Sequence, residues 1–188
     1  MSEFDVGVPA PGRAAEGGSA HTDPGVQRQL DALGIAHEVL ECDPSLADTE
    51  AFCAHYGIPR DNAANAIVVA AKTEPRQYAA CVVLATTKID VNHKLSKIMG
   101  IKRLSFASAD ETKELTGQLI GGVTVFALPE SLPIYVDSRV MERDYVIVGG
   151  GNRATKIKLA PAELRKVPRL KVVDLAVPRD QSAAPAGA

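Results

Sequence analysis

The chain has 188 residues and a formal net charge of −2, which favours one domain and excludes a basic field over the whole surface. Hydrophobic residues make up 46% and charged residues 23%, a balance typical of globular proteins. Aromatic residues make up only 4%, so stacking of bases on aromatic side chains is excluded as the main mode of nucleic-acid binding.

The first two helices are predicted from their end signals. Asp23 can cap a helix that stops at Gly34, and Asp48 or Thr49 opens a second helix that stops at Gly57. Between these helices we expect a short strand at residues 35–40.

Two β-rich runs follow, at residues 66–71 and 78–84, and a polar stretch separates them. This pattern predicts a hairpin. Both runs are apolar at nearly every residue, which indicates strands that are covered on both faces.

Helices and strands are mixed in the rest of the chain. A helix capped by Asp90 or Asn92 is expected to stop at Gly100, and the capping box that begins at Ser108 opens a helix ending at Gly117. The remaining predicted elements are strands at 104–107, 124–128, 133–137, 145–149, 155–159 and 170–173, with a short helix from Pro161. The order predicts an α/β fold of the mixed (α+β) type: a single compact domain with a mixed, largely antiparallel curved sheet flanked by helices.

Both ends of the chain differ in composition from the middle. Residues 1–22 are rich in Gly, Ala and Pro without any period, and residues 178–188 have the same character. We expect a disordered N-terminal arm and a disordered C-terminal tail around one folded domain at residues 23–177.

Little in the sequence supports a metal site or insertion into a membrane. The three cysteines form no CxxC pair, and the four histidines show neither HxH nor HExxH spacing, so we expect no metal. The apolar runs are too short to cross a bilayer, and no secretory signal is recognisable at the N-terminus. These features predict a cytoplasmic protein with no membrane partner.

The strongest local motif is the glycine pair Gly121 and Gly122, which precedes Thr124. Paired glycines permit a positive φ and a close approach of a ligand to the backbone. Two free N–H groups at such a turn can stabilise the oxyanion of a tetrahedral intermediate. An ordinary loop between a helix and a strand explains the same residues.

A second glycine run, residues 149–151, precedes Arg153 and Lys156. It lacks the context of a Walker loop or a dinucleotide fingerprint. A glycine hairpin here can present both cations to a phosphate or a carboxylate, and a tight hairpin with solvated charges is the alternative.

Two further groups of polar residues are weaker signals. Asp137 and Ser138 stand at the end of a predicted strand, where such a pair can line a cleft or simply cap a helix. Basic residues around the third helix can contact tRNA or form a solvated face: Lys88, Lys94, Lys97, Lys102 and Arg103.

Taken in chain order, these stretches resemble the YbaK/EbsC-like aminoacyl-tRNA deacylase family, whose fold is that of the editing domain of prolyl-tRNA synthetase. The matching segments are ADTEAFCAHYGIP, NAIVVAA, YAACVVLATTKIDVNHKL, ASADETKELTGQLIGGVTVFALP, LPIYVDSRV and VIVGGGNRATKIKL. The resemblance implies a trans-acting deacylase that hydrolyses the ester of a mischarged tRNA without a cofactor. It implies the 3′ aminoacylated end of tRNA as partner, and an aminoacyl-tRNA synthetase as a second candidate partner.

The resemblance also implies roles for individual residues. Gly121, Gly122 and Thr124 would form a loop that orients the attacking water and the ribose hydroxyls. The positions implied to line or rim the substrate pocket are Asp137, Ser138, Gly150, Arg153 and Lys156.

The chain departs from the family pattern at one chemically important place. Family members carry a lysine at the start of the first hairpin strand, where this chain has Asn65. Lys72 does not replace it, because a shifted register would conflict with the apolar pattern. The glycine loop departs as well, with Val125 and Ala127 where a proline and a glycine are common.

Asn65 can donate hydrogen bonds but brings no charge. Two alternatives to the deacylase follow. One is a non-catalytic module that binds tRNA, an amino acid or a synthetase. The other is an enzyme that hydrolyses a different ester or an amide.

Overall fold

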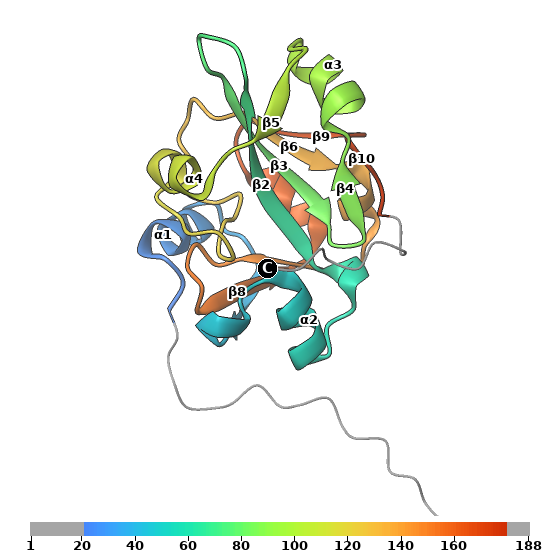
Figure 1. The fold of residues 1–188 in the computed structure, drawn as a ribbon. Coiled ribbons are helices and arrows are strands. Elements are labelled where there is room, and N and C mark those ends of the chain that lie inside the picture. The colour runs from blue at the N-terminus through green and yellow to red at the C-terminus, as the bar shows by residue number, and fades with distance from the viewer. Residues whose placement is uncertain (1–20, 180–188) are drawn as a thin grey trace, which may run out of the picture.

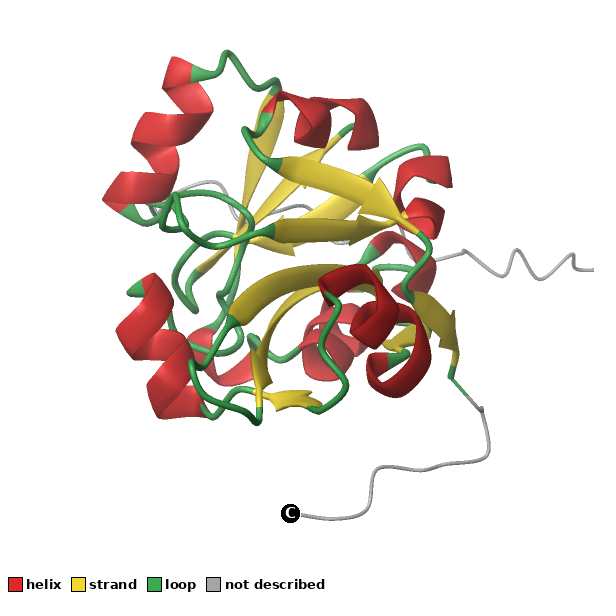
Figure 2. Ribbon diagram, turned by 90° about the horizontal axis from the view of Figure 1, so that it is seen from above, coloured by secondary structure: helices red, strands yellow, loops and turns green. Residues whose placement is uncertain are grey.

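The structure, a computed structural model, describes residues 21–179. The predicted arm at 1–22 and tail at 178–188 therefore lie outside the described residues, except for two positions at the inner end of each. In the described part, helices surround β-sheets on several sides (Figure 1, Figure 2).

The strands form three sheets, with the orders β5-β2-β3-β6-β9, β1-β8-β7 and β10-β4. In the five-stranded sheet β2 runs antiparallel to β3 and β5, whereas β3 and β6, and β6 and β9, are parallel. The strand bounds are β1 His37–Glu41, β2 Ala64–Ala71, β3 Tyr78–Leu84, β4 Thr87–Ile89, β5 Leu104–Phe106, β6 Ile134–Asp137, β7 Val146–Gly149, β8 Thr155–Leu159, β9 Leu170–Val173 and β10 Ala176–Pro178. The prediction of a mixed, largely antiparallel sheet in one α/β domain is confirmed.

The helices begin and end close to the predicted residues. Asp23 caps the first helix with its side chain, and Ser108 and Glu111 form the complete capping box. Gly57 takes a φ of +66° directly after the second helix, which is the left-handed stop that favours glycine. The α-helix bounds are α1 Pro24–Ala32, α2 Thr49–Tyr56, α3 Ser96–Met99 and α4 Ala109–Thr116, and a π-helical turn, Val91–Leu95, leads into α3.

Several 3₁₀ segments connect these elements. They are Pro44–Leu46, Arg60–Asn62, Ser138–Glu142 and Pro161–Lys166.

The hairpin of β2 and β3 is the centre of the core. Along β3, Val82 packs into one apolar cluster and the next residue, Val83, packs into another, and both are fully buried. Neighbouring residues of a strand point to opposite faces of the sheet, so β3 is covered on both sides, as its continuous apolar run predicted.

The predicted strand at 124–128 is wrong, because this segment is a loop of turns. The buried Gln118 side chain makes the hydrogen bonds that a neighbouring strand would make. Its Oε1 accepts from the N–H of Thr124 at 2.9 Å, and its Nε2 donates to the carbonyl of Phe126 at 2.8 Å. Ala127 has a φ of +56°, which is incompatible with an extended strand. Sequence analysis also missed the short strands β4 and β10, which pair with each other.

Candidate functional site

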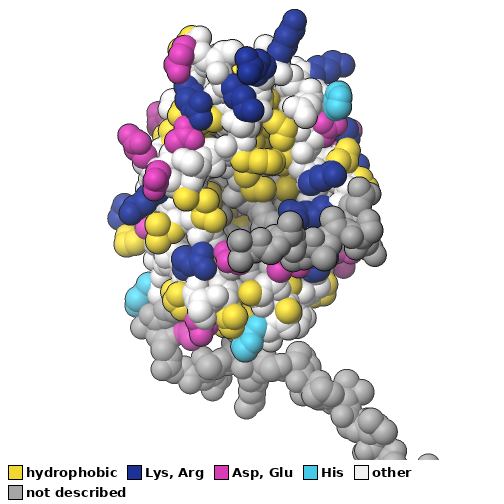
Figure 3. Space-filling view, viewed as in Figure 1, with side chains coloured by type: hydrophobic (Ala, Val, Ile, Leu, Met, Phe, Trp, Pro, Cys, Tyr) yellow, Lys and Arg dark blue, Asp and Glu magenta, His cyan; other side chains and the backbone are white. Residues whose placement is uncertain are grey.

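A cavity of about 210 Å³ opens where the five-stranded sheet meets β7 and β8. Strand β2, helices α2 and α4, and the glycine loop, here defined as residues 120–124, complete its walls. A bridge between Ala63 and Ile147 holds β2 and β7 together beside it. Apolar side chains gather in the middle of the face shown in Figure 3, and basic side chains gather at the end formed by the hairpin and α3.

The glycine loop packs backbone to backbone against the turn that follows β7. Gly151 donates its N–H to the carbonyl of Gly122 at 2.8 Å. A Cβ added to Gly122 would lie 2.2 Å from the carbonyl oxygen of Asn152, and one added to Gly149 would lie 2.4 Å from that of Gly122. Only glycine therefore fits at either position without a shift of the backbone.

Two backbone donors of the glycine loop remain available. Gly121 and Val123 both line the cavity, and their N–H groups donate no hydrogen bond within residues 21–179. Gly121 has a φ of +92°, a conformation that glycine adopts readily. The loop can thus offer two donors to a negatively charged oxygen.

Thr124 and Gly122 contribute from behind the wall rather than from its surface. Thr124 is fully buried, and the hydrogen bond to Gln118 occupies its N–H. Gly122 donates its own N–H to Leu119 at 2.9 Å. Both residues set the shape of the loop, and Gly121 and Val123 face the cavity.

Asn65 and Gly121 line the same cavity, from β2 and from the glycine loop. The Asn65 side chain accepts a hydrogen bond from the hydroxyl of Thr49, the first residue of α2. Thr49 also lines the cavity, so α2 and β2 together provide a polar edge. Sequence analysis did not single out Thr49 for this role, because only the fold brings α2 against β2.

Lys156 lies inside the cavity wall and not at its rim, which corrects the prediction. Its side chain is only 6% exposed, and its Nζ donates to the carbonyls of Ala47 and Gly121, each at 2.6 Å. The ring of Phe52 lies 5.4 Å from this ammonium. Burial lowers the pKa of Lys156 below the usual lysine value of 10.5, because it disfavours the charged form.

Arg153 does not line the cavity, and its side chain contacts the protein itself. Its guanidinium donates to the carbonyls of Pro44 at 3.1 Å and Ile120 at 2.7 Å, and it pairs with Asp48 at 3.3 Å. These contacts tie the glycine loop to the start of α2.

Gly150 does not line the cavity, which corrects a further prediction. Its N–H donates to Thr155 at 3.1 Å, and its carbonyl accepts from Asp23 at 3.0 Å. Its backbone groups are therefore used to hold the turn against α1.

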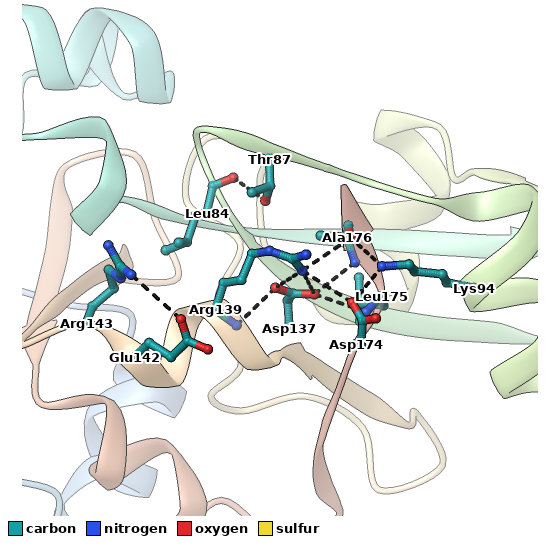
Figure 4. Close-up of polar contacts among 10 residues, drawn as sticks. All are labelled: Leu84, Thr87, Lys94, Asp137, Arg139, Glu142, Arg143, Asp174, Leu175 and Ala176. Carbon is teal, nitrogen blue, oxygen red and sulfur yellow. Dashed lines mark hydrogen bonds and ion pairs between the residues drawn. The ribbon is translucent and has the colours of Figure 1, made fainter. Parts of the chain in front are cut away.

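Asp137 and Ser138 also lie away from the cavity, so their predicted role as pocket residues is wrong. Figure 4 shows the Asp137 carboxylate inside a closed set of polar contacts. It receives N–H groups from Leu175 at 3.0 Å and Ala176 at 2.8 Å, and it pairs with Arg139 at 3.2 Å. The strand-end carboxylate fastens the chain after β9 to β6, which is a structural task.

The cavity lining, as drawn from the described residues, contains no serine, cysteine or histidine. Burial raises the pKa of Cys42 and Cys53 near the site, and it raises that of Cys81 in the core to about 12. Such thiols stay protonated and are poor nucleophiles. Within residues 21–179, no group of three or more His, Cys, Asp and Glu side chains is placed to hold a metal.

Among residues 21–179, no helix is both long enough and apolar enough to cross a bilayer.

Comparison with known proteins places this geometry in a family. Residues 43–167 match the model of the aminoacyl-tRNA editing domain. Among solved structures, the hypothetical protein APE2540 has a TM-score of 0.73 at 24% identity, covering 81% of this chain and 99% of that one. A candidate trans-editing enzyme for prolyl-tRNA synthetase has a TM-score of 0.69 at 24% identity, covering 81% and 97%.

A scaffold protein used for epitope backbone grafting has a TM-score of 0.69 at 21% identity, also covering 81% and 97%. At these identities the structural likenesses show the shared fold. The family model goes further, because residues 43–167 are 125 of the 188 residues of the chain. The chain belongs to the aminoacyl-tRNA editing domain family.

Proposed function

We propose that this protein is a trans-acting aminoacyl-tRNA deacylase, which hydrolyses the ester that joins an amino acid to the 3′ end of a tRNA. The observation that carries the proposal is that Gly121 and Val123 line a cavity shared with Asn65, while their N–H groups donate no hydrogen bond within residues 21–179. Membership of the editing family supports the same reaction.

The size of the cavity suits an aminoacyl group. Its volume of about 210 Å³ is below the roughly 300–1,000 Å³ typical of pockets for drug-sized ligands. Apolar side chains such as Ile67 and Ile147 line much of it, and Thr49 and Asn65 supply a polar edge. The amino acid would enter the cavity, and the rest of the tRNA would stay on the surface.

Water is the proposed nucleophile, because the lining taken from the described residues holds no serine, cysteine or histidine. Several of its other candidates are engaged: Asp48 pairs with Arg153, the Thr49 hydroxyl donates to Asn65, and Lys156 donates to two carbonyls. Water adds to the ester carbonyl carbon, and the N–H groups of Gly121 and Val123 stabilise the resulting oxyanion. The bond from carbon to the ribose oxygen then breaks, and that oxygen takes up a proton. The products are a free amino acid and a tRNA with a free terminal hydroxyl.

The partner surface would be the basic end of the molecule in Figure 3. Lys97, Lys102 and Arg103 are exposed there. Lys94 is already occupied, because it pairs with Asp174 at 2.7 Å. Exposed cations at one end of a protein with a net charge of −2 would attract tRNA phosphates locally and weaken with added salt.

The decisive experiment is release of free amino acid from a panel of mischarged tRNAs. The expected result is hydrolysis of at least one member well above the rate in buffer. Hydrolysis at the buffer rate for every member contradicts the proposal.

Asn65 favours a second candidate function, a non-catalytic module that binds tRNA, an amino acid or a synthetase. The Asn65 amide brings no charge and already accepts from Thr49. One result would favour this binding module: the wild type binds tRNA but hydrolyses no aminoacyl ester, whereas the Asn65→Lys variant hydrolyses the ester of a mischarged tRNA.

A further inference from the structure

Lys156 is a buried basic residue in the cavity wall, and its hydrogen bonds are incomplete. An ammonium group has three N–H donors. Two of them reach the carbonyls of Ala47 and Gly121. Among residues 21–179 no carboxylate pairs with it within 4.0 Å, since Asp48, the acidic residue in the cavity lining, pairs with Arg153.

A buried cation without a counter-charge is unusual, because burial of an unpaired charge is costly. Lys156 is 6% exposed, so water does little to compensate. Its surroundings are two carbonyl dipoles and the ring of Phe52. In its protonated form Lys156 therefore keeps one N–H donor and its positive charge for whatever occupies the cavity.

The position of Lys156 identifies the part of the substrate that it can reach. Its Nζ donates to the carbonyl of Gly121, which lines the cavity and whose own N–H donates no hydrogen bond within residues 21–179. An oxygen bound at the glycine loop would therefore lie near the ammonium. We propose that Lys156 contacts the substrate, and that its third donor binds the ester carbonyl oxygen and stabilises the oxyanion formed when water attacks.

This inference rests on the proposed function and adds a charged group to it. It also accounts for Asn65, which stands in β2 and brings no charge to the cavity. Lys156 comes from β8 instead, on a different wall of the same cavity. The positive charge of this site would thus be supplied by β8 and not by β2.

Some charged and titratable neighbours of Lys156 lower its pKa, and others raise it. Burial lowers its pKa, and Arg153 adds to the decrease, whereas Cys42, Asp48 and Cys53 act to raise it. An oxyanion placed beside the ammonium would raise the pKa of Lys156 on binding. That change can be observed without any turnover.

The first arm of the test is kinetic and compares Lys156→Met with Lys158→Met. Lys158 is the matched control, because it lies two residues away on β8, is 41% exposed and pairs with Glu38 outside the cavity. We expect Lys156→Met to lower kcat about 100-fold, the effect of losing one oxyanion donor, with KM changed less than about threefold. Lys158→Met should retain the wild-type rate. A wild-type kcat in Lys156→Met overturns the proposal.

The second arm measures binding of two non-hydrolysable analogues of 3′-alanyl-adenosine, one a neutral amide and one an anionic phosphonate. Lys156→Met should weaken the phosphonate at least about tenfold more than the amide, because only the phosphonate carries the negative charge. An equal loss for both analogues would indicate a merely structural lysine and would overturn the proposal.

The third arm uses the wild type with ¹³C-labelled lysine and follows the Lys156 signal by NMR as pH is varied. Saturation with the phosphonate should raise the pKa of Lys156, and the amide should raise it less. This arm still decides the question if Lys156→Met does not fold. It also decides it if the wild type hydrolyses no aminoacyl-tRNA, in which case the proposed function fails separately. An unchanged Lys156 titration with bound phosphonate overturns the proposal.

Discussion

Asp137 and Lys156 are two buried charges in one domain, and the protein surrounds them in opposite ways. The Asp137 carboxylate is fully buried and receives three backbone N–H groups, from Arg139, Leu175 and Ala176, and the guanidinium of Arg139 (Figure 4). Within the described residues, the Lys156 ammonium donates to two carbonyls, lies near the ring of Phe52 and pairs with no carboxylate. The comparison teaches that a buried charge with a complete set of partners supports the fold, whereas an incomplete one beside a cavity is available to a ligand.

The largest expected effect is on stability. Asp137→Ala removes the acceptor of three backbone N–H groups, those of Arg139, Leu175 and Ala176. Among residues 21–179 it leaves the Arg139 side chain with the exposed Asp174 as its carboxylate partner. We expect the free energy of unfolding to fall by about 3–5 kcal/mol, as measured by urea denaturation.

Asp174→Ala is the matched control, because Asp174 pairs with the same arginine at 3.3 Å but its side chain is 61% exposed. It should lose less than about 1 kcal/mol. If the two variants lose similar amounts, the complete set of partners around buried Asp137 does not support the fold more than an exposed ion pair does.

The next effect is a dependence of stability on pH. The pKa of Lys156 is lowered in the folded protein, so between that pKa and 10.5 the unfolded chain binds more protons than the folded one. Stability contributed by this residue therefore rises with pH across that window. Thermal unfolding of the wild type and Lys156→Met should show the wild type gaining on the variant as pH rises from neutral. Parallel pH curves would show that the lysine titrates normally.

The smallest effect is expected at an exposed charge. Lys158 pairs with Glu38 at 3.5 Å, and its Nζ lies 5.0 Å from the ring of Tyr145. Lys158→Met should change the free energy of unfolding by less than about 1 kcal/mol, and thermal unfolding at neutral pH can test this. A larger loss of unfolding free energy would mean that an exposed charge can stabilise the fold as much as a buried one.

Elements that depend on contacts between residues close in sequence were predicted correctly, and elements that depend on more distant contacts were not. Helix ends depend on local chemistry, and caps such as Asp23 and Ser108 were located from a few neighbouring letters. The failed strand at 124–128 is a longer-range case, because the Gln118 side chain replaced a strand partner there.

The site was predictable only in part for the same reason. The shared cavity of Asn65 and Gly121 agrees with the family resemblance. Lys156 was placed at the rim because its partners Ala47 and Gly121 lie 109 and 35 positions away in the chain. Asp137 was predicted to line the pocket because the sequence does not show that its partners would be Leu175 and Ala176, which follow a neighbouring strand of the sheet.

The contact between Gly122 and Gly149 bears on how such a protein could be redesigned. Each position leaves no room even for a methyl group. Side-chain variation there cannot tune the choice of amino acid without moving the loop. A library intended to change selectivity is better directed at the opposite wall, where Thr49, Asn65 and Ile67 present side chains to the cavity.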